Sequence, residues 1–130
     1  PFEDESFDFI FLTSVFTHML PDDMKNYFSE ISRTLKNGGR TLVTFFLFNN
    51  ESSELIAQQK STLDFKYEYA KYRTVNSTMP EQAVCYDESF ILDLYNKYGF
   101  DIQGQVHYGS WCGRGNTRSY QDIVIARRLG

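Results

Sequence analysis

Cysteine is scarce in this sequence. The two cysteines, Cys85 and Cys112, are too few to build a metal-binding framework and need not form a disulfide. A reducing cytoplasm is therefore the expected compartment, and no metal site is expected.

Long apolar runs and an excess of basic residues are also missing. No apolar run approaches the ~20 residues that a membrane-spanning helix needs, so we expect no membrane partner. The 13 basic residues stand against 17 acidic ones, which gives a net charge of -4. Nucleic-acid-binding domains usually carry a basic stripe, so we expect no nucleic-acid partner either.

Apolar and aromatic residues, by contrast, are abundant. They make up 42% and 17% of the 130 residues, enough for the packed core of one modest domain and too many for a disordered tail. The sequence opens on Pro1 and leads directly into an apolar run. We interpret it as beginning inside a domain.

A strand, a helix and a second strand are predicted within residues 7–48. Residues 7–14 (FDFIFLTS) contain four consecutive apolar residues, which is typical of a strand covered on both faces. Residues 22–36 have apolar side chains at helical spacing, and residues 37–39 (NGG) are expected to end that helix. Residues 40–48 (RTLVTFFLF) follow as a strand. Because a helix joins the two strands, they should be parallel.

The remaining residues give weaker signals. Ser52 or Ser53 is expected to begin a helix that runs to about residue 64, and residues 65–86 form a tyrosine-rich, lid-like insertion. A helix and a final hairpin are expected over residues 87–128. Asp87 would begin the helix and Gly99 would end it. Residues 100–108 and 121–127 would be antiparallel neighbours, because the link between them is short.

Short motifs occur here in a recognisable order, in PFEDESFDFIFLTSVFTHM and, further on, in ISRTLKNGGRTLVTFF. The motif positions are Pro1, Phe2, Phe7, Asp8, His18, Arg33, Leu35, Lys36, Gly38 and Gly39. In this order they resemble the middle of a class I S-adenosylmethionine (SAM)-dependent methyltransferase. The match is close over residues 1–48 and weaker over residues 86–127.

The resemblance implies an α/β fold: part of a Rossmann-like methyltransferase sheet, with an antiparallel C-terminal strand pair. It also implies SAM as the cofactor. The family's glycine-rich loop has no counterpart here, because neither Gly38-Gly39 nor Gly113-Arg114-Gly115 follows a first strand into a helix. We therefore expect residues 1–130 to be the C-terminal part of a single methyltransferase domain within a longer enzyme, inactive alone.

Ligands of open α/β sheets bind beyond the carboxyl ends of the parallel strands. This rule selects the turn after the first strand, the end of the second strand, and the loop over residues 107–114. For the turn, the resemblance implies that Thr13, Ser14, Val15 and His18 contact the methionine part of SAM. A plain strand-to-helix turn is the alternative.

The two histidines are candidate general bases. His107 is the better placed, if the acceptor is a hydroxyl that must lose its proton. His18 is the second candidate, since the pKa of a histidine is ordinarily about 6.5. The alternatives are a solvent-facing strand residue for His107 and a ring satisfied by backbone groups for His18.

The loop YGSWCGRG supplies candidate substrate contacts. Tyr108, Trp111 and Arg114 suit a ring stacked on an aromatic side chain, with a carboxylate or phosphate held by the guanidinium. Phe46, near the end of the second strand, is a further candidate. The alternative is that Trp111 caps the core and Arg114 is a surface charge.

The expected reaction is methyl transfer from SAM to an O, N or C nucleophile of a small molecule. A neutral thioether leaves, so proximity and desolvation supply much of the acceleration. The alternative is a non-catalytic, methyltransferase-like interaction module, in which an exposed sheet edge favours pairing, including a homodimer. Half of another nucleotide-binding domain would fit the strand–helix–strand unit but not the motif details.

Overall fold

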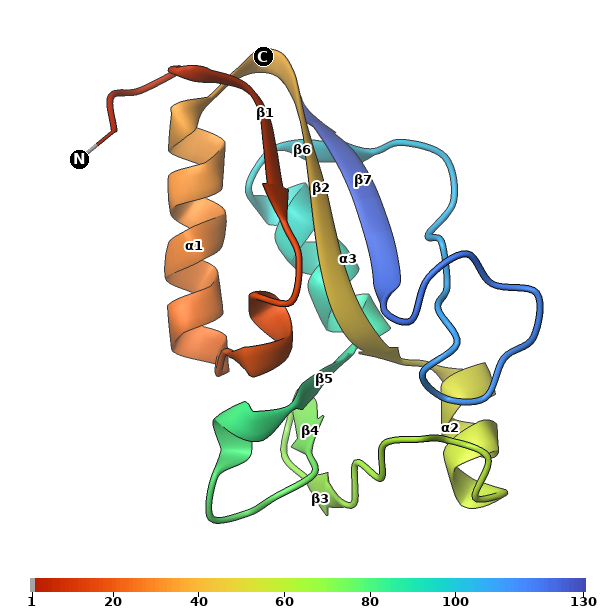
Figure 1. The fold of residues 1–130 in the computed structure, drawn as a ribbon. Coiled ribbons are helices and arrows are strands. Elements are labelled where there is room, and N and C mark those ends of the chain that lie inside the picture. The colour runs from red at the N-terminus through yellow and green to blue at the C-terminus, as the bar shows by residue number, and fades with distance from the viewer. Residues whose placement is uncertain (1) are drawn as a thin grey trace.

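The computed structural model describes residues 2–130, which form a seven-stranded mixed sheet and its helices (Figure 1). Pro1, the first motif position, lies outside the described residues. In chain order the elements are β1 (Phe7–Leu12), the 3-10 turn η1 (Phe16–His18), α1 (Pro21–Thr34), β2 (Leu35–Phe48), α2 (Asn50–Ala57), β3 (Tyr67–Glu68), β4 (Tyr72–Thr74), the 3-10 turn η2 (Pro80–Gln82), β5 (Val84–Asp87), α3 (Glu88–Lys97), β6 (Phe100–Ile102) and β7 (Asp122–Arg128).

The predicted strand–helix–strand unit is present as β1, α1 and β2. β1 and β2 are parallel, with Leu12 opposite Val43, as expected. Pro21 opens α1 with a fixed φ, and two acidic residues in the first turn suit the positive end of the helix. The buried face of α1 carries Met24, Phe28 and Ile31 against the sheet.

The glycine pair after α1 has a different role from the one expected. The helix ends at Thr34, and Leu35 is already extended and opposite Phe7, so Gly38 and Gly39 lie inside β2. Pairing shifts between Phe7 and Phe9, and the extra residues of β2 are accommodated there with Gly38 at a φ of 77°. A Cβ on Gly39 would meet the carbonyl oxygen of Lys36 at 2.8 Å. The glycines therefore shape an irregular strand start instead of a helix end.

The C-terminal strands are antiparallel, as expected. β7 pairs with β6 on one side and with β2 on the other, antiparallel in both cases. β6 is shorter than expected and ends at Ile102, after which His107 makes an isolated bridge to Ile123. The strand order β1-β2-β7-β6 therefore places the two parallel strands beside the final pair.

The middle of the chain departs most from the sequence expectations. α2 ends at Ala57 instead of near residue 64, and its cap is Asn49, whose side chain and Ser52 satisfy each other's backbone N–H groups. The insertion (residues 65–86) is part of the sheet. β5 pairs in parallel with the last residues of β2, and β4 and β3 continue outward from it, antiparallel.

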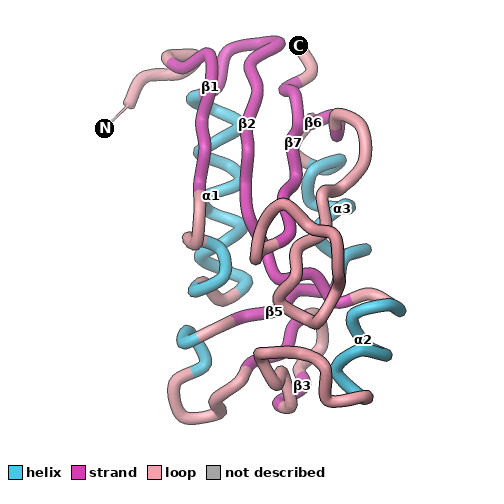
Figure 2. Tube along the Cα trace, turned by 45° about the vertical axis from the view of Figure 1, so that its right-hand side comes forward, coloured by secondary structure: helices cyan, strands magenta, loops and turns pink. Residues whose placement is uncertain are grey.

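One face of the sheet is apolar but open. Phe9 and Phe11 are 51% and 64% exposed, whereas a strand covered on both faces was expected. Register places them on the same side as Leu42, Ile123 and Ile125, all half-buried. We call these five residues the open face. Figure 2 shows α1 and α3 behind β1, β2 and β7. On the other side, α2 packs against a smaller core around Phe46 at the end of β2, and the open face lies beyond that core.

The covered face holds the main core. Phe45 is 1% exposed and packs against Phe16 and Tyr95, with ring centroids 5.6 and 6.3 Å away. Neither α1 nor any other helix in residues 2–130 is long and apolar enough to cross a bilayer.

Because one face is buried and the other is exposed, removing an aromatic ring should lower the free energy of unfolding by different amounts on the two faces. Phe45→Ala should lower the free energy of unfolding by about 3–5 kcal/mol, because it leaves a cavity in the core. Phe11→Thr should lower it by less than about 1 kcal/mol, because that ring is largely in solvent. Urea denaturation followed by circular dichroism measures both. Equal losses would contradict the one-sided packing.

Candidate functional site

The β1 turn (residues 13–15) lies at the carboxyl end of β1, where a ligand was expected. Ser14 has a φ of 58°, a left-handed conformation that costs energy for a residue other than glycine. Its backbone N–H donates to Thr44 Oγ1 at 2.9 Å, and its hydroxyl accepts from Gln121 Nε2 at 3.0 Å. The sheet therefore holds an exposed, strained turn in one conformation.

His18 lies at the end of η1, three residues beyond the turn. Its Nδ1 is 3.1 and 3.0 Å from the backbone carbonyl oxygens of Glu81 and Gln82, both in the insertion. The ring is thus tied to backbone groups, which is the alternative noted for it from the sequence. The structure links it to the insertion, a contact that sequence reasoning missed.

A completely buried carboxylate, Asp122, organises the region at the end of β2. It accepts hydrogen bonds from the backbone N–H groups of Leu47 at 2.8 Å and Gly109 at 2.7 Å, and from the Trp111 indole at 3.0 Å. Arg114 Nη1 is 3.4 Å away. Burial raises the pKa of Asp122, while these donors oppose the rise.

Two candidate substrate residues, Phe46 and Trp111, lie in the core. Trp111 is 0% exposed and Phe46 is 4% exposed, and their rings pack edge to face at 5.4 Å with Phe65 beside both. Both rings therefore face the interior of this structure, and their role as substrate contacts stays a prediction. The physical reason is the Trp111 N–H, which is satisfied internally by Asp122 and turns the indole inward.

Arg114 is an internal residue, which excludes the surface charge offered as its alternative. Its side chain is 7% exposed, pairs with Glu51 and Asp122, and lies 4.7 Å from the centre of the Tyr108 ring. Asn49 Oδ1 is 3.4 Å from its Nη2. With its donors already engaged, the guanidinium holds the loop to α2 and is less available to a ligand than expected.

Tyr108 joins the same polar cluster. Its hydroxyl donates to Glu88 Oε1 at 2.5 Å, and Asn49 Nδ2 is 3.4 Å from that oxygen. Burial first, and then the hydrogen bond to Glu88, raise the pKa of Tyr108 to about 12. A neutral phenol beside a carboxylate therefore faces the end of β2.

His107 stands apart from this cluster. It is exposed and opposite Ile123, which is itself opposite Thr44, so these three residues share the open side of the sheet. Among residues 2–130 no side-chain group hydrogen-bonds to its ring. The hydrogen-bonded cluster of Tyr108 and Arg114 therefore does not include the candidate base among the described residues.

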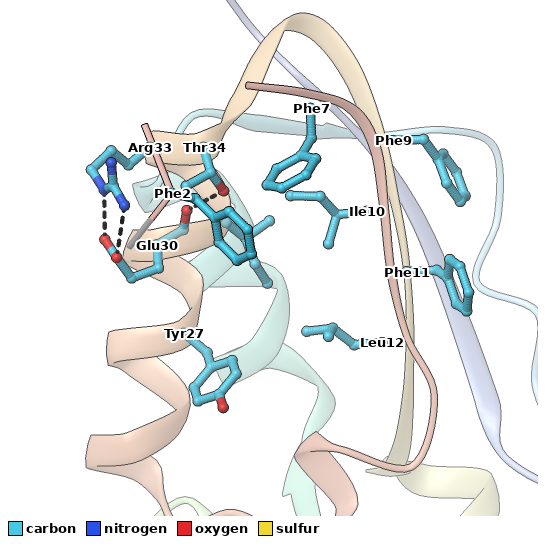
Figure 3. A pocket seen from close by; sticks show the side chains of 11 residues that line it. Phe2, Phe7, Phe9, Ile10, Phe11, Leu12, Tyr27, Glu30, Arg33 and Thr34 are labelled. Atoms are coloured by element: carbon cyan, nitrogen blue, oxygen red, sulfur yellow. Dashed lines mark hydrogen bonds and ion pairs between the residues drawn. The ribbon is translucent and has the colours of Figure 1, made fainter. Parts of the chain in front are cut away.

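Two pockets border these elements. One, of about 410 Å³, lies at the ends of β2 and β5 and is lined by Phe48, Asn49, Arg73 and Glu88, among others. The second, of about 360 Å³, is apolar and lies along β1, where Ile10 and Leu12 point toward α1 and Phe9 and Phe11 point away (Figure 3). Only the first is at a carboxyl end, where the sheet rule expects a ligand.

For several residues of the site, the sequence gave little indication that they belong to it. Asp122 is the exception, because a single acidic residue at the start of an apolar strand indicates a buried or functional carboxylate. Thr44, Glu88 and Arg73 looked like ordinary strand, helix-start and insertion residues. Within residues 2–130, no group of three or more His, Cys, Asp or Glu side chains is placed to hold a metal ion.

Comparison with known proteins identifies the fold. A family model described as a methyltransferase domain matches residues 1–43. A SAM-dependent methyltransferase from Methanosarcina mazei aligns with 98% of this chain at 18% identity, with a TM-score of 0.65. The 1,6-didemethyltoxoflavin-N1-methyltransferase of Burkholderia thailandensis, solved with 1,6-didemethyltoxoflavin and S-adenosylhomocysteine, also aligns with 98%, at 15% identity and a TM-score of 0.59.

The chain therefore shares its fold with solved SAM-dependent methyltransferases, and the resemblance of the motifs to a methyltransferase domain is confirmed over residues 1–43. The sheet is a partial Rossmann-like sheet, as expected. This chain spans 62% of the length of the Methanosarcina protein and 46% of the Burkholderia enzyme.

The buried carboxylate gives a stability prediction. Asp122→Asn should lower the free energy of unfolding by about 2–4 kcal/mol, because one amide oxygen is unable to serve all the donors now bound by two carboxylate oxygens. Urea denaturation measures the loss. The matched control is Asp93→Asn on the exposed side of α3, which should change the free energy by less than about 0.5 kcal/mol. An equally mild effect at Asp122 would show that the cluster is not a structural hub.

The Tyr108–Glu88 pair gives a prediction at alkaline pH. Native Tyr108 keeps its proton to about pH 12, whereas the ordinary value is 10.0, so its contribution to the free energy of unfolding falls as pH rises through that interval. Glu88→Gln should lower the pKa of Tyr108 while leaving it above 10.0, because burial is the larger cause. NMR or ultraviolet titration against Tyr108→Phe measures it. An unchanged pKa would refute the role of Glu88.

Proposed function

We propose that residues 1–130 are the methionine-side and acceptor-side part of a SAM-dependent methyltransferase that acts on a small-molecule nucleophile, within a longer enzyme. The observation that carries the proposal is the strained Ser14 turn, held by Thr44 and Gln121 at the carboxyl end of a parallel strand. Strained backbone of this kind persists where surrounding contacts enforce it, and it clusters at ligand sites. The methyltransferase fold supports the same position.

The residues of the turn suit the methionine part of SAM. Thr13 and Ser14 are exposed, and Val15 packs against the core, so backbone groups and short hydroxyls are presented from a fixed base. SAM, when bound, supplies the methyl group on a positively charged sulfur. The turn's part would be to orient that group; contacts to adenosine would come from residues beyond this chain, in keeping with its partial span of the solved methyltransferases.

The acceptor is proposed to enter at the pocket formed by the ends of β2 and β5. Asn49, Arg73 and Glu88 give this pocket both donors and acceptors, which suits a small polar molecule. The Burkholderia enzyme, which shares the fold, was solved with 1,6-didemethyltoxoflavin bound. His107 does not line this pocket, so it is proposed as the base only for an acceptor that also reaches the exposed side of the sheet where His107 lies.

A second candidate function rests on the open face and the free edge of β1. β1 pairs with β2 on one edge, and its outer edge has no partner strand among residues 2–130. An apolar sheet face beside such an edge is a surface on which another chain can pair. A non-catalytic interaction module, including a homodimer formed through that edge, would use this surface and leave the Ser14 turn empty. SAM binding separates the two functions.

Calorimetric titration tests the proposal. SAM should bind the product that includes the upstream coding residues, and should bind residues 1–130 far more weakly. In the longer product Thr44→Val should weaken binding about tenfold, the effect of losing one well-formed hydrogen bond that fixes the turn.

The control is Thr41→Val on the same strand, because the buried Thr41 hydroxyl has no partner among the described residues. Its affinity should match the unsubstituted protein. Equal SAM affinity for residues 1–130 and for the longer product would refute the proposal that the adenosine contacts lie outside residues 1–130. Absence of SAM binding by either product would favour the interaction module.

A further inference from the structure

Two short turns, η1 and η2, far apart in the sequence, are joined by one imidazole. His18 Nδ1, on η1, lies 3.1 Å from the carbonyl oxygen of Glu81 and 3.0 Å from that of Gln82, both on η2. Carbonyl oxygens only accept hydrogen bonds, so Nδ1 must carry the proton. We call this pair of hydrogen bonds the clasp.

A second hydrogen bond supports the clasp from the neighbouring strand. The Tyr86 hydroxyl donates to the carbonyl oxygen of Met19 at 2.6 Å. Tyr86 is 1% exposed, and burial raises the pKa of its hydroxyl well above the ordinary value, so it remains a donor. The insertion is thus fixed to the segment just after the β1 turn at two points.

The middle of the insertion, at β4, reaches the acceptor pocket. Arg73 lies 3.9 Å above the ring of Phe48, the last residue of β2, and pairs with Glu68 at 3.0 Å. On the β4–β5 ladder Arg73 is opposite Cys85, which precedes Tyr86. The clasp and the pocket wall therefore belong to one hydrogen-bonded unit.

We infer that His18 is a positioning residue whose Nδ1–H holds the insertion against η1, next to the β1 turn, making the insertion the wall that links the cofactor turn to the acceptor pocket. The names of the two ligands rest on the proposed function; the clasp itself is a property of this chain. An Nδ1–H donated to a carbonyl also leaves Nε2 as an acceptor, the arrangement of a histidine base. The test must therefore separate positioning from proton transfer.

Three substitutions make that separation. In His18→Asn the amide nitrogen takes the place of Nδ1 and keeps the donor without any base. His18→Gln places its donor nearer the position of Nε2, and His18→Ala removes it. We expect amide hydrogen exchange over residues 79–84 to be about fivefold faster in the Ala and Gln variants, the effect of one lost hydrogen bond, and close to unsubstituted in Asn.

Tyrosine variants of the insertion provide a matched pair. Tyr86→Phe should speed exchange over the same residues, whereas Tyr67→Phe should not, since the Tyr67 hydroxyl has no hydrogen-bond partner among residues 2–130. Nitrogen-15 NMR of the imidazole should find the Nδ1–H tautomer of neutral His18. An Nε2–H tautomer, or an Asn variant that exchanges as fast as the Ala variant, would overturn the clasp.

The link to the site is tested in the longer product. SAM affinity should be retained in His18→Asn and reduced in His18→Ala. Equal affinity in both would overturn the coupling of the insertion to the turn. Absence of SAM binding by the unsubstituted protein would instead refute the proposed function, and the exchange and tautomer results on residues 1–130 would still decide the clasp.

Discussion

The buried carboxylate of Asp122 is the interaction on which the arrangement of the C-terminal half depends. It joins the backbone of β2 at Leu47, the loop at Gly109 and the indole of Trp111 where β7 begins. A buried charge without donors would be costly, so the loop is obliged to fold inward over it. Arg114 folds inward with this loop and pairs with both Asp122 and Glu51. Because Glu51 is on α2, this pairing positions that helix. One desolvated group thereby sets the shape of the loop and the position of α2 at the end of β2.

The two faces of the sheet are packed unequally within the described residues. One face carries the main core along its whole length, and the other carries a smaller core around Phe46 and Trp111 and leaves the open face exposed. Rings on the covered face, such as Phe45, provide the stability, while Phe9 and Phe11 on the other face remain in solvent. Parallel sheets are normally covered on both faces, so the open face is a surface suited to further structure. The β1 turn and the pocket at the ends of β2 and β5 lie at the strand ends, where the packed core fixes the backbone and the side chains remain open to solvent.

The candidate site was only partly predictable. Position followed from topology: the Ser14 turn is where the strand-end rule placed it, and Tyr108 lies near the end of β2. Side-chain roles did not follow, because they depend on partners distant in sequence. Trp111 is turned inward by Asp122, and His18 meets carbonyl groups more than sixty residues away. Residue type suggests what a group can do, and its neighbours decide what it does.

The sequence by itself determined the strand–helix–strand unit, the parallel pairing of β1 and β2 and the antiparallel end, because local periodicity and short connections govern these. The methyltransferase fold was implied by the resemblance of the ordered motifs. Only the tertiary structure decided that the insertion joins the sheet through β5. It likewise placed Gly38 within a strand and left one sheet face open. These features arise from register and burial between segments far apart in the chain, which local patterns do not encode.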